Sequence, residues 1–289
     1  MSTSLRVEDS LQAAIRGSQG PEAPPLLASA LRYAVFPGGH RIRPRLCLSV
    51  ARACGDSDPA AADGAAAAIE LLHCASLVHD DLPCFDDAPL RRGKPSVHVE
   101  FGAPIAVLTG DALIVLAFET LARGAVNSPR RLAALLPKIA QAVGAPSGIV
   151  AGQAWECEAT VSLSDYQRAK TGSLFVAATV AGAIAAGAVG ECWIALGELL
   201  GEAYQVADDL RDVLCSADEL GKPIGQDAAR FRPNAAAQLG VGGAKNRLEG
   251  LVRAAIESIP ACPGADELRA LIKAQTAQFL PRHRALEAA

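Results

Sequence analysis

Two groups of aspartates stand out in a chain that is otherwise mostly apolar. The first lies within residues 77–98, LVHDDLPCFDDAPLRRGKPSVH, and contains Asp80, Asp81, Asp86 and Asp87. Like charges on neighbouring helical positions repel each other, whereas a bound divalent cation turns that repulsion into attraction. Mg²⁺ takes carboxylate oxygens together with substrate phosphates. The spacing therefore indicates a magnesium site, and the alternative is a solvated acidic surface.

Basic side chains follow this first group directly. Arg91, Arg92 and Lys94 come shortly after the last aspartate. A guanidinium binds phosphate through two parallel hydrogen bonds. Carboxylates that can bind a cation therefore lie next to basic side chains that can bind an anion. This combination predicts a site where a phosphate or diphosphate is bound together with a metal ion.

The second group repeats the pattern further along the chain. Residues 201–213 read GEAYQVADDLRDV and hold Asp208, Asp209 and Asp212. Asp208 and Asp212 lie one turn apart on the same face of a helix. Two such groups, each on a mostly apolar helix, can face each other across a cavity. Together they predict several Mg²⁺ ions that hold a diphosphate between them.

The elements that position these groups are predicted to be helices. The chain has 289 residues, of which 51% are hydrophobic and only 4% aromatic, and alanine dominates. It has no run of alternating β-branched and aromatic residues that would favour a sheet. It also has no linker-like segment. We therefore expect an all-α fold in a single domain over residues 1–289.

Proline and glycine residues indicate where the helices are expected to begin and end. The helices are expected at about residues 4–35 (in one or two pieces), 44–52, 61–82, 102–122, from 129, around 174–190, 191–215 and from 234. Residues 90–101 are expected to form a loop, Pro137 to kink or shorten its helix, and Gly242-Gly243 to break the C-terminal helices. The apolar helix at 102–122 should be buried on all sides, either in the core or against a second subunit.

Charge and composition exclude several classes of function. The net charge is −4, and the absence of a basic tract argues against nucleic acid as a partner. The first ten residues lack the apolar core of a signal peptide. Residues 174–190 are too short and too weakly apolar for a membrane span, so we interpret them as a buried helix. The eight cysteines form no CxxC pair, which indicates free buried thiols in a reducing cytoplasm.

Further residues suit an anion. His40, Arg41 and Arg43 lie in a Gly-Pro loop at the start of a helix, where free backbone N–H groups favour anions. His73 precedes Asp80 by two turns on the same face. Lys170 and Thr171 open the apolar helix, and Lys222, Arg230 and Arg232 lie in or after a Gly-broken loop that would close as a lid. For each of these residues, the alternative to anion binding is that the side chain is simply solvated or packed in the core.

With these residues in view, the chain resembles the trans-isoprenyl diphosphate synthases of the polyprenyl synthetase family. The resemblance runs from about residue 31 to residue 234 and includes both aspartate-rich motifs, Arg91-Arg92, Lys170-Thr171-Gly172 and Gly221-Lys222. It is most similar to a bacterial geranylgeranyl diphosphate synthase. The resemblance implies a helical bundle around a deep central cavity, usually a homodimer, which condenses isopentenyl diphosphate with an allylic diphosphate.

The resemblance also implies roles for individual residues. The implied magnesium ligands, for three ions with substrate, are Asp80, Asp81, Asp86, Asp208, Asp209 and Asp212. The residues implied to hold the allylic diphosphate are Arg91, Lys170, Thr171, Gln205 and Lys222. Those implied to hold isopentenyl diphosphate are His40, Arg43, His73 and Arg92. Three positions depart from the family's pattern: His40 stands in place of a lysine, Gln226 in place of a second loop lysine, and Glu156 where aspartate is commoner.

Product length is expected to depend on Ala75 and Ser76. A growing isoprenoid tail would run from Asp80 back along its helix, where one turn rises about 5.4 Å. Family members that make C15 commonly carry an aromatic residue five positions before the first aspartate, where this chain has Ala75. We therefore expect the C20 product, geranylgeranyl diphosphate. The alternatives are a C15 synthase, a non-catalytic partner subunit and a terpene cyclase.

Overall fold

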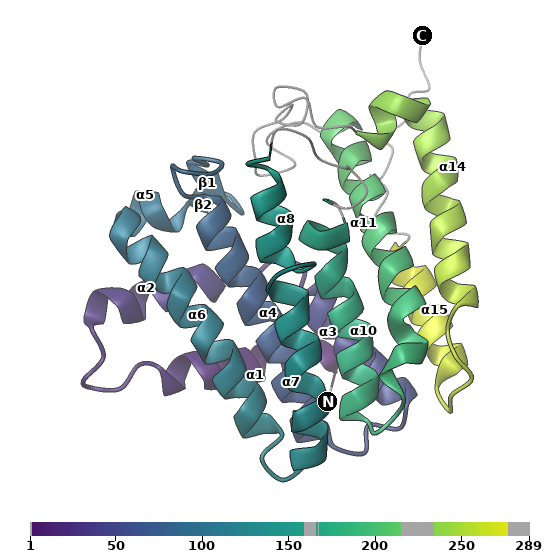
Figure 1. Cartoon of the computed structure of the whole chain (residues 1–289), viewed down its shortest axis with the longest axis horizontal. Coiled ribbons are helices and arrows are strands. Elements are labelled where there is room, and N and C mark those ends of the chain that lie inside the picture. The colour runs from purple at the N-terminus through teal and green to yellow at the C-terminus, as the bar shows by residue number, and fades with distance from the viewer. Residues whose placement is uncertain (1, 159–165, 167, 215–233, 277–289) are drawn as a thin grey trace.

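The computed structural model describes residues 2–158, 166, 168–214 and 234–276, and these residues form helices and one short hairpin. Figure 1 shows α4, α10, α11 and α14 following one another from left to right, with α1 and α2 at the left behind α6 and α4. The elements are α1 (Thr3–Gly17), α2 (Pro25–Val35), α3 (Ile42–Ala53), α4 (Pro59–Asp80), β1 (Leu90–Arg91), β2 (Lys94–Pro95), α5 (Val97–Phe101), α6 (Ala103–Gly124), α7 (Pro129–Val143), α8 (Ile149–Trp155), the π-helical turn η1 (Arg168–Gly172), α10 (Ser173–Ala185), the 3₁₀ turn η2 (Gly190–Trp193), α11 (Ile194–Leu214), α14 (Ala235–Glu257) and α15 (Ala265–Thr276). The all-α prediction is confirmed.

Helix α4 is the centre of the bundle. Asp58 caps its first turn by accepting a 3.1 Å hydrogen bond from the backbone N–H of Ala61. Pro59 takes the first helical position, where a missing N–H costs no hydrogen bond. The alanine-rich middle is buried because α4 packs against α1, α3, α6 and α10. The helix ends at Asp80, so its burial holds the first aspartate group at one end of the bundle.

Helices α10 and α11 form the opposite wall and pack backbone against backbone. A Cβ added to Gly197 of α11 would lie 2.5 Å from the Cα of Val176 on α10, so only glycine fits there. Helix α10 is almost entirely buried because it also packs against α3 and α4. The expectation of a buried apolar helix is therefore confirmed, but the helix ends at Ala185 and not near residue 190. The turn η1, just before α10, contacts the later part of α11 and places Lys170 and Thr171 beside it.

Residues 90–101 are not the loop that the sequence predicts. They form the antiparallel hairpin of β1 and β2, followed by α5. Arg92 and Gly93 connect the strands with positive φ angles of 55° and 75°, the geometry of the tightest hairpin turns. Arg-Gly is not one of the dipeptides that usually signal such a turn, which is why the pattern misses it.

Two breaks also differ from expectation. Pro137 does not shorten α7, which runs on to Val143, because the packing of α7 on α10 holds the helix where one backbone donor is missing. Helix α14 is interrupted at Gly240, with φ of 70°, and not at the Gly242-Gly243 pair. Its start at the N-cap Asn234 agrees with the prediction.

Helix α6 is only partly buried. The prediction that it is buried on all sides is therefore wrong for the single chain. Val107, Leu108 and Val115 are 41%, 51% and 67% exposed. By length and composition alone, α4 and α6 are long and apolar enough to cross a membrane among the described residues, but α4 lies inside the bundle. The apolar face of α6 is therefore open in the single chain.

The cysteines agree only in part with the expectation of buried thiols. The seven cysteines in the described ranges are all free. Cys47 and Cys74 are buried, which raises the pKa of Cys47 to about 12 and that of Cys74 to about 11. Cys84, Cys157 and Cys192 are exposed.

Candidate active site

Two carboxylates of the first aspartate group meet a third carboxylate from beyond the end of α8. Oxygens of Asp80, Asp86 and Glu156 all lie within 4.8 Å of one another. The backbone N–H of Asp86 donates to the Asp80 carbonyl at 2.9 Å, which folds the loop back over the helix end. The ammonium of Lys170 donates to Asp80 at 3.1 Å and to Glu156 at 2.7 Å. Three acids and one base thus converge at the end of α4.

This donor set fits magnesium. Carboxylate oxygens are the ligands that hard cations take, and the Lys170 ammonium already lies between two of them. Burial raises the pKa of Asp80; the charge of Lys170 lowers it and that of Asp86 raises it, with a net upward shift. A bound cation would relieve this repulsion between acids. The residues that would hold it are Asp80, Asp86 and Glu156.

Asp81 is engaged separately from this cluster. It is 2% exposed and pairs with Arg91, whose Nε donates to both of its carboxylate oxygens at 3.0 and 3.1 Å. Burial raises the pKa of Asp81, and the Arg91 guanidinium opposes that shift. The predictions that Asp81 binds a metal ion and that Arg91 binds the allylic diphosphate both require this ion pair to open. Both roles stay predictions.

The second aspartate group lies on the last turns of α11. Asp208 accepts from the Arg211 guanidinium at 3.0 Å. Asp209 is buried and accepts from Gln205 Nε2 at 3.0 Å and from the backbone N–H of Ala235 at 2.8 Å. Its Oδ2 therefore ties α11 to the start of α14, while its Oδ1 is held by Gln205 of the same helix. A structural role of this kind competes with metal binding for Asp209. The roles of Asp208 and of the half-buried Asp212 as metal ligands stay predictions.

The turn η1 connects the two groups. Lys170 reaches Asp80 of the first group, and the hydroxyl of the next residue, Thr171, donates to Gln205 Oε1 at 3.2 Å. Gln205 in turn donates to Asp209 of the second group. One polar chain thus runs from the end of α4 through η1 to α11. Turns of the π type are frequent at functional sites because they shift side chains out of helical register.

The predicted isopentenyl diphosphate residues also gather. Arg43 Nη1 lies 3.5 Å from His73 Nε2, and the Arg43 guanidinium stacks over Phe175 and Tyr204 at 4.7 and 5.6 Å from the ring centroids. Burial lowers the pKa of Arg43. Burial, followed by the charges of Arg43 and nearby arginines, lowers the pKa of His73 well below 6.5, so this imidazole is neutral.

Two further residues of that set lie beside this pair. Arg92 packs against Gly39, where an added Cβ would lie 3.1 Å from Arg92 Nε. His40 is the next residue along the chain and is exposed. The loop before α3 and the β1–β2 turn therefore present basic groups to the same region.

The predicted product-length residues lie on α4 below the first aspartates. Ala75 is 2% exposed, and the Ser76 hydroxyl donates to the His73 carbonyl at 2.8 Å. The role of both residues in chain length stays a prediction.

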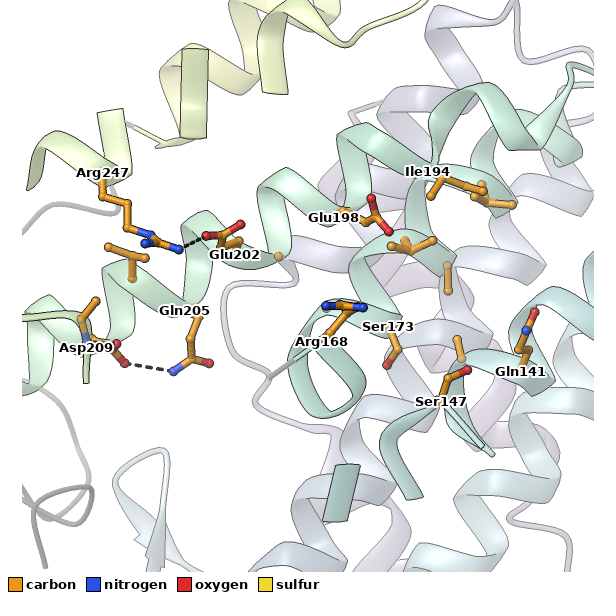
Figure 2. A pocket seen from close by; sticks show the side chains of 18 of the residues that line it. Gln141, Ser147, Arg168, Ser173, Ile194, Glu198, Glu202, Gln205, Asp209 and Arg247 are labelled. Carbon is orange, nitrogen blue, oxygen red and sulfur yellow. Dashed lines mark hydrogen bonds and ion pairs between the residues drawn. The ribbon is translucent and has the colours of Figure 1, made fainter. Parts of the chain in front are cut away.

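A pocket of about 900 Å³ lies on one flank of the bundle, between α7, α10, α11 and α14 (Figure 2). Gln205 and Asp209 border it at one end, while Ile194 lies at the other. None of the described residues of the first aspartate group lines it. This pocket therefore adjoins the second wall from outside and is not the space between the two groups.

Some residues that lie in the site are not predicted as site residues from the sequence. Glu156 is noted there only as a departure, although Gly152-Gln153 before it marks a polar break in an apolar region. Tyr166, whose hydroxyl donates to Glu156 at 2.5 Å, and Arg211 are missed altogether. Lys222, Arg230 and Arg232, the predicted lid, lie outside the described residues.

A helical bundle in which two aspartate-rich helix ends flank a lysine–threonine turn is the architecture of metal-dependent enzymes that act on prenyl diphosphates. The profile of polyprenyl synthetases matches residues 24–261. The chain belongs to the polyprenyl synthetase family.

Known proteins agree with this assignment. The chain is 56% identical to a geranylgeranyl diphosphate synthase of Cereibacter sphaeroides, over 97% of this chain and 98% of that protein. It is 54% identical to a geranylgeranyl diphosphate synthase of Rhodobacter capsulatus, over 94% of each. Among solved structures, it superimposes on a geranyltransferase of Helicobacter pylori in complex with magnesium and isoprenyl diphosphate, with a TM-score of 0.82, 28% identity and 96% coverage of both chains.

Proposed function

We propose that the chain, as a single domain over residues 1–289, condenses isopentenyl diphosphate with allylic diphosphates and releases mainly geranylgeranyl diphosphate. The observation that carries the proposal is the polar chain from Asp80 through Lys170 and Thr171 to Gln205 and Asp209. It places both aspartate groups around one turn. The two relatives of more than 50% identity bear the name of a C20 synthase, which favours C20 over the C15 alternative.

The residues of the site divide the work between two diphosphates. Lys170, Thr171 and Gln205 hold the allylic diphosphate between the aspartate groups, and Lys170 stabilises the negative charge that grows on it as it leaves. Magnesium, held by carboxylates such as Asp80 and Asp86, neutralises diphosphate charge when it is bound. The apolar walls of α4 and α10 keep water from the allylic cation.

The basic group at the other side orients the second substrate. Arg43, Arg92 and His40 bind the diphosphate of isopentenyl diphosphate, and neutral His73 contributes a hydrogen bond rather than a charge. The allylic carbon–oxygen bond breaks and diphosphate leaves with the electron pair, and the double bond of isopentenyl diphosphate then attacks the allylic cation. A proton then leaves the new chain, and the released diphosphate is its acceptor. This mechanism requires no protein nucleophile.

We propose that the product stops growing where its isoprenoid tail reaches the part of α4 that precedes the first aspartates. Ala75 and Ser76 are small, so they leave room that an aromatic side chain would fill. Ala75→Tyr should shift the main product from C20 to C15 in an assay that sizes the products. An unchanged product distribution would remove Ala75 from the account of chain length.

The assembly and setting are proposals too. We propose a homodimer in the cytoplasm, with three magnesium ions in each substrate-loaded site. The exposed apolar face of α6, with Val107, Leu108 and Val115, supports the dimer because large apolar patches on one chain mark interaction surfaces.

The test is incorporation of labelled isopentenyl diphosphate by purified protein with Mg²⁺ and allylic primers. Asp80→Asn and Asp208→Asn should each lower kcat at least about 100-fold, because each removes a charge from one wall. Asp87→Asn is the matched control, since the Asp87 side chain is 70% exposed and pairs only loosely with His98 at 3.6 Å. Its activity should stay within about twofold.

The same assay separates the rival functions. A cyclase would release diphosphate from the allylic substrate alone. A non-catalytic partner subunit would incorporate no label from any primer, and in that case His40→Lys is the first reversion to make. Either result would contradict the proposal.

A further inference from the structure

The loop that carries His40 is fixed by a buried arginine next to it. Arg41 is the N-cap of α3, has a φ of 50° and is 6% exposed. Each of its three guanidinium nitrogens donates to the protein: Nε to Glu8 at 2.9 Å, Nη1 to Glu70 at 2.7 Å and Nη2 to the Val35 carbonyl at 2.8 Å. These acceptors belong to α1, α4 and α2. One side chain therefore ties three helices to the start of a fourth.

The central contact of this anchor is a buried ion pair. The side chains of Arg41 and Glu70 are 5% and 2% exposed. A buried charge is costly unless it is paired and hydrogen-bonded, so either residue without the other would be strongly destabilising. Burial lowers the pKa of Arg41, but the charges and hydrogen bonds of Glu70 and Glu8 raise it more. Arg41 therefore stays charged.

The anchor lies directly next to the basic group that is proposed to bind isopentenyl diphosphate. Glu70 precedes His73 by about one turn of α4, and Arg41 precedes Arg43 by two residues of α3. The Arg41–Glu70 pair thus sets the register in which Arg43 and His73 meet at 3.5 Å.

The same anchor shapes the loop itself. A Cβ added to Gly38 would lie 2.1 Å from Cζ of Arg41, so the loop crosses the guanidinium in direct contact. The next residue, Gly39, lies against Arg92. Lys94 holds the beginning of the loop by donating to the Phe36 carbonyl at 2.9 Å. The loop is therefore enclosed between Arg41 and Arg92.

We propose that Arg41 is a positioning residue for the isopentenyl diphosphate site. Through Glu70 and Glu8 it holds the loop at 36–43 so that His40, Arg43 and Arg92 meet one diphosphate together. Arg41 does not itself touch the substrate, because its nitrogens all donate to protein acceptors. The proposal rests on the proposed function, since it assumes that this basic group binds the second diphosphate.

The chain offers a matched control in Arg6. This side chain is 13% exposed and also binds two carboxylates, Asp63 at 2.8 Å and Asp56 at 2.6 Å. It joins α1 to the beginning of α4, whereas Arg41 binds Glu70 in the middle of α4, about one turn before His73. Arg6→Lys therefore disturbs a similar ion pair of the same bundle at a distance from the site.

The experiment compares Arg41→Lys with Arg6→Lys in steady-state kinetics, with each substrate varied in turn. A lysine keeps the charge but cannot reach three acceptors at once. Arg41→Lys should raise KM for isopentenyl diphosphate about tenfold and leave KM for the allylic substrate within about twofold. Arg6→Lys should leave both constants within about twofold, although both variants should lower the melting temperature.

Two further variants keep the test decisive. Glu70→Gln retains a carbonyl acceptor for Arg41 and should raise the same KM less than Arg41→Lys does. If Arg41→Lys does not fold, Glu8→Gln removes the charge of the 43% exposed partner and should raise that KM about two- to threefold.

Some outcomes would overturn the inference alone. One is an unchanged KM for isopentenyl diphosphate in Arg41→Lys, and another is an equal rise in both KM values. A selective rise in Arg6→Lys would also overturn it, because any weakened ion pair would then have the same effect. If the unmodified protein elongates nothing, the proposed function fails instead. Calorimetric binding of inorganic pyrophosphate to the unmodified protein and to Arg41→Lys then decides the inference: equal affinities overturn it.

Discussion

At the scale of single residues, the aspartate groups are stable because each has a basic partner. Lys170 lies between Asp80 and Glu156, Arg91 pairs with Asp81, and Arg211 with Asp208. These contacts offset the repulsion of neighbouring acids. When a diphosphate binds with its cations, some of these ion pairs must open. The basic groups that are released can then bind the diphosphate.

The first prediction concerns Lys170. Lys170→Met keeps the length of the side chain but removes the charge that stabilises the leaving diphosphate. It should lower kcat/KM for the allylic substrate at least about 100-fold in the incorporation assay. Lys138→Met is the control, because Lys138 pairs with Glu191 at 3.2 Å on the surface of α7. Equal losses in both variants would contradict the role of Lys170.

The second prediction uses the buried imidazole of His73. Its pKa is well below 6.5 in the folded chain, so the unfolded chain binds a proton first as pH falls. Stability should therefore be lost from about pH 6.5 downwards, by up to about 1.4 kcal/mol per pH unit from this residue. Urea unfolding at pH 7.5 and 5.5 should show a smaller loss in His73→Gln than in the unmodified protein. Equal losses would show that His73 does not titrate in this way.

The sequence singles out candidate site residues where the signal is local. Asp208 and Asp212 are recognisable because helical spacing puts them on one face, and Asp80 because it lies at the end of a long apolar helix. Asp86 lies in the turn after that helix. Glu156 joins Asp80 only through the packing of α8 and η1 near α4, which no spacing reveals. Such contacts between distant segments require the three-dimensional structure.

At the scale of elements, the site depends on how closely α10 and α11 approach. Gly197 meets the backbone of α10, and Gly201 meets Gly172 of η1, where an added Cβ would lie 2.9 Å from the Gly172 Cα. These two contacts set the position of η1 against α11. Thr171 and Gln205 can then meet at 3.2 Å.

The third prediction tests this packing. Gly197→Ala should lower the free energy of unfolding by about 1–3 kcal/mol, because the added methyl group has no space beside α10. Gly250→Ala on α14 is the control, since a Cβ there meets nothing within 4 Å. It should be neutral or stabilise by about 0.5–1 kcal/mol. Urea unfolding measures both, and an unaffected Gly197→Ala would contradict the close packing.

Helices were easier to predict than the connections between them. Alanine content and the Pro233-Asn234 pair mark helices directly in the sequence, whereas the cap at Asp58 is seen only in the structure. The hairpin turn at Arg92-Gly93 has an unusual dipeptide, and Pro137 is tolerated because tertiary packing supports α7. In both cases the surrounding structure outweighs the local preference.

At the scale of the whole molecule, the exposed face of α6 is the main feature that a single chain does not explain. The helix lies at one side of the bundle in Figure 1, and Val115 is 67% exposed. The sequence predicts an apolar helix here, but whether its outer face is covered depends on a partner. A homodimer would bury this face.

The fourth prediction tests that assembly. The unmodified protein should have twice the 29.7 kDa mass of the chain in light scattering. Val115→Glu should shift it toward the monomer, because a charge in an apolar interface is costly. Val189→Glu, at a position that is 65% exposed outside α6, should leave the mass unchanged. A monomeric unmodified protein, or an unaltered dimer in Val115→Glu, would contradict the role of α6.

The central claim is that the two aspartate groups of this chain carry out prenyl transfer that ends at C20. Its most direct test is the size of the products formed from labelled isopentenyl diphosphate with C5, C10 and C15 allylic primers in Mg²⁺, after removal of the diphosphate. Geranylgeraniol should be the main product from each primer. Accumulation of C15 without further elongation, or no labelled product from any primer, would contradict it.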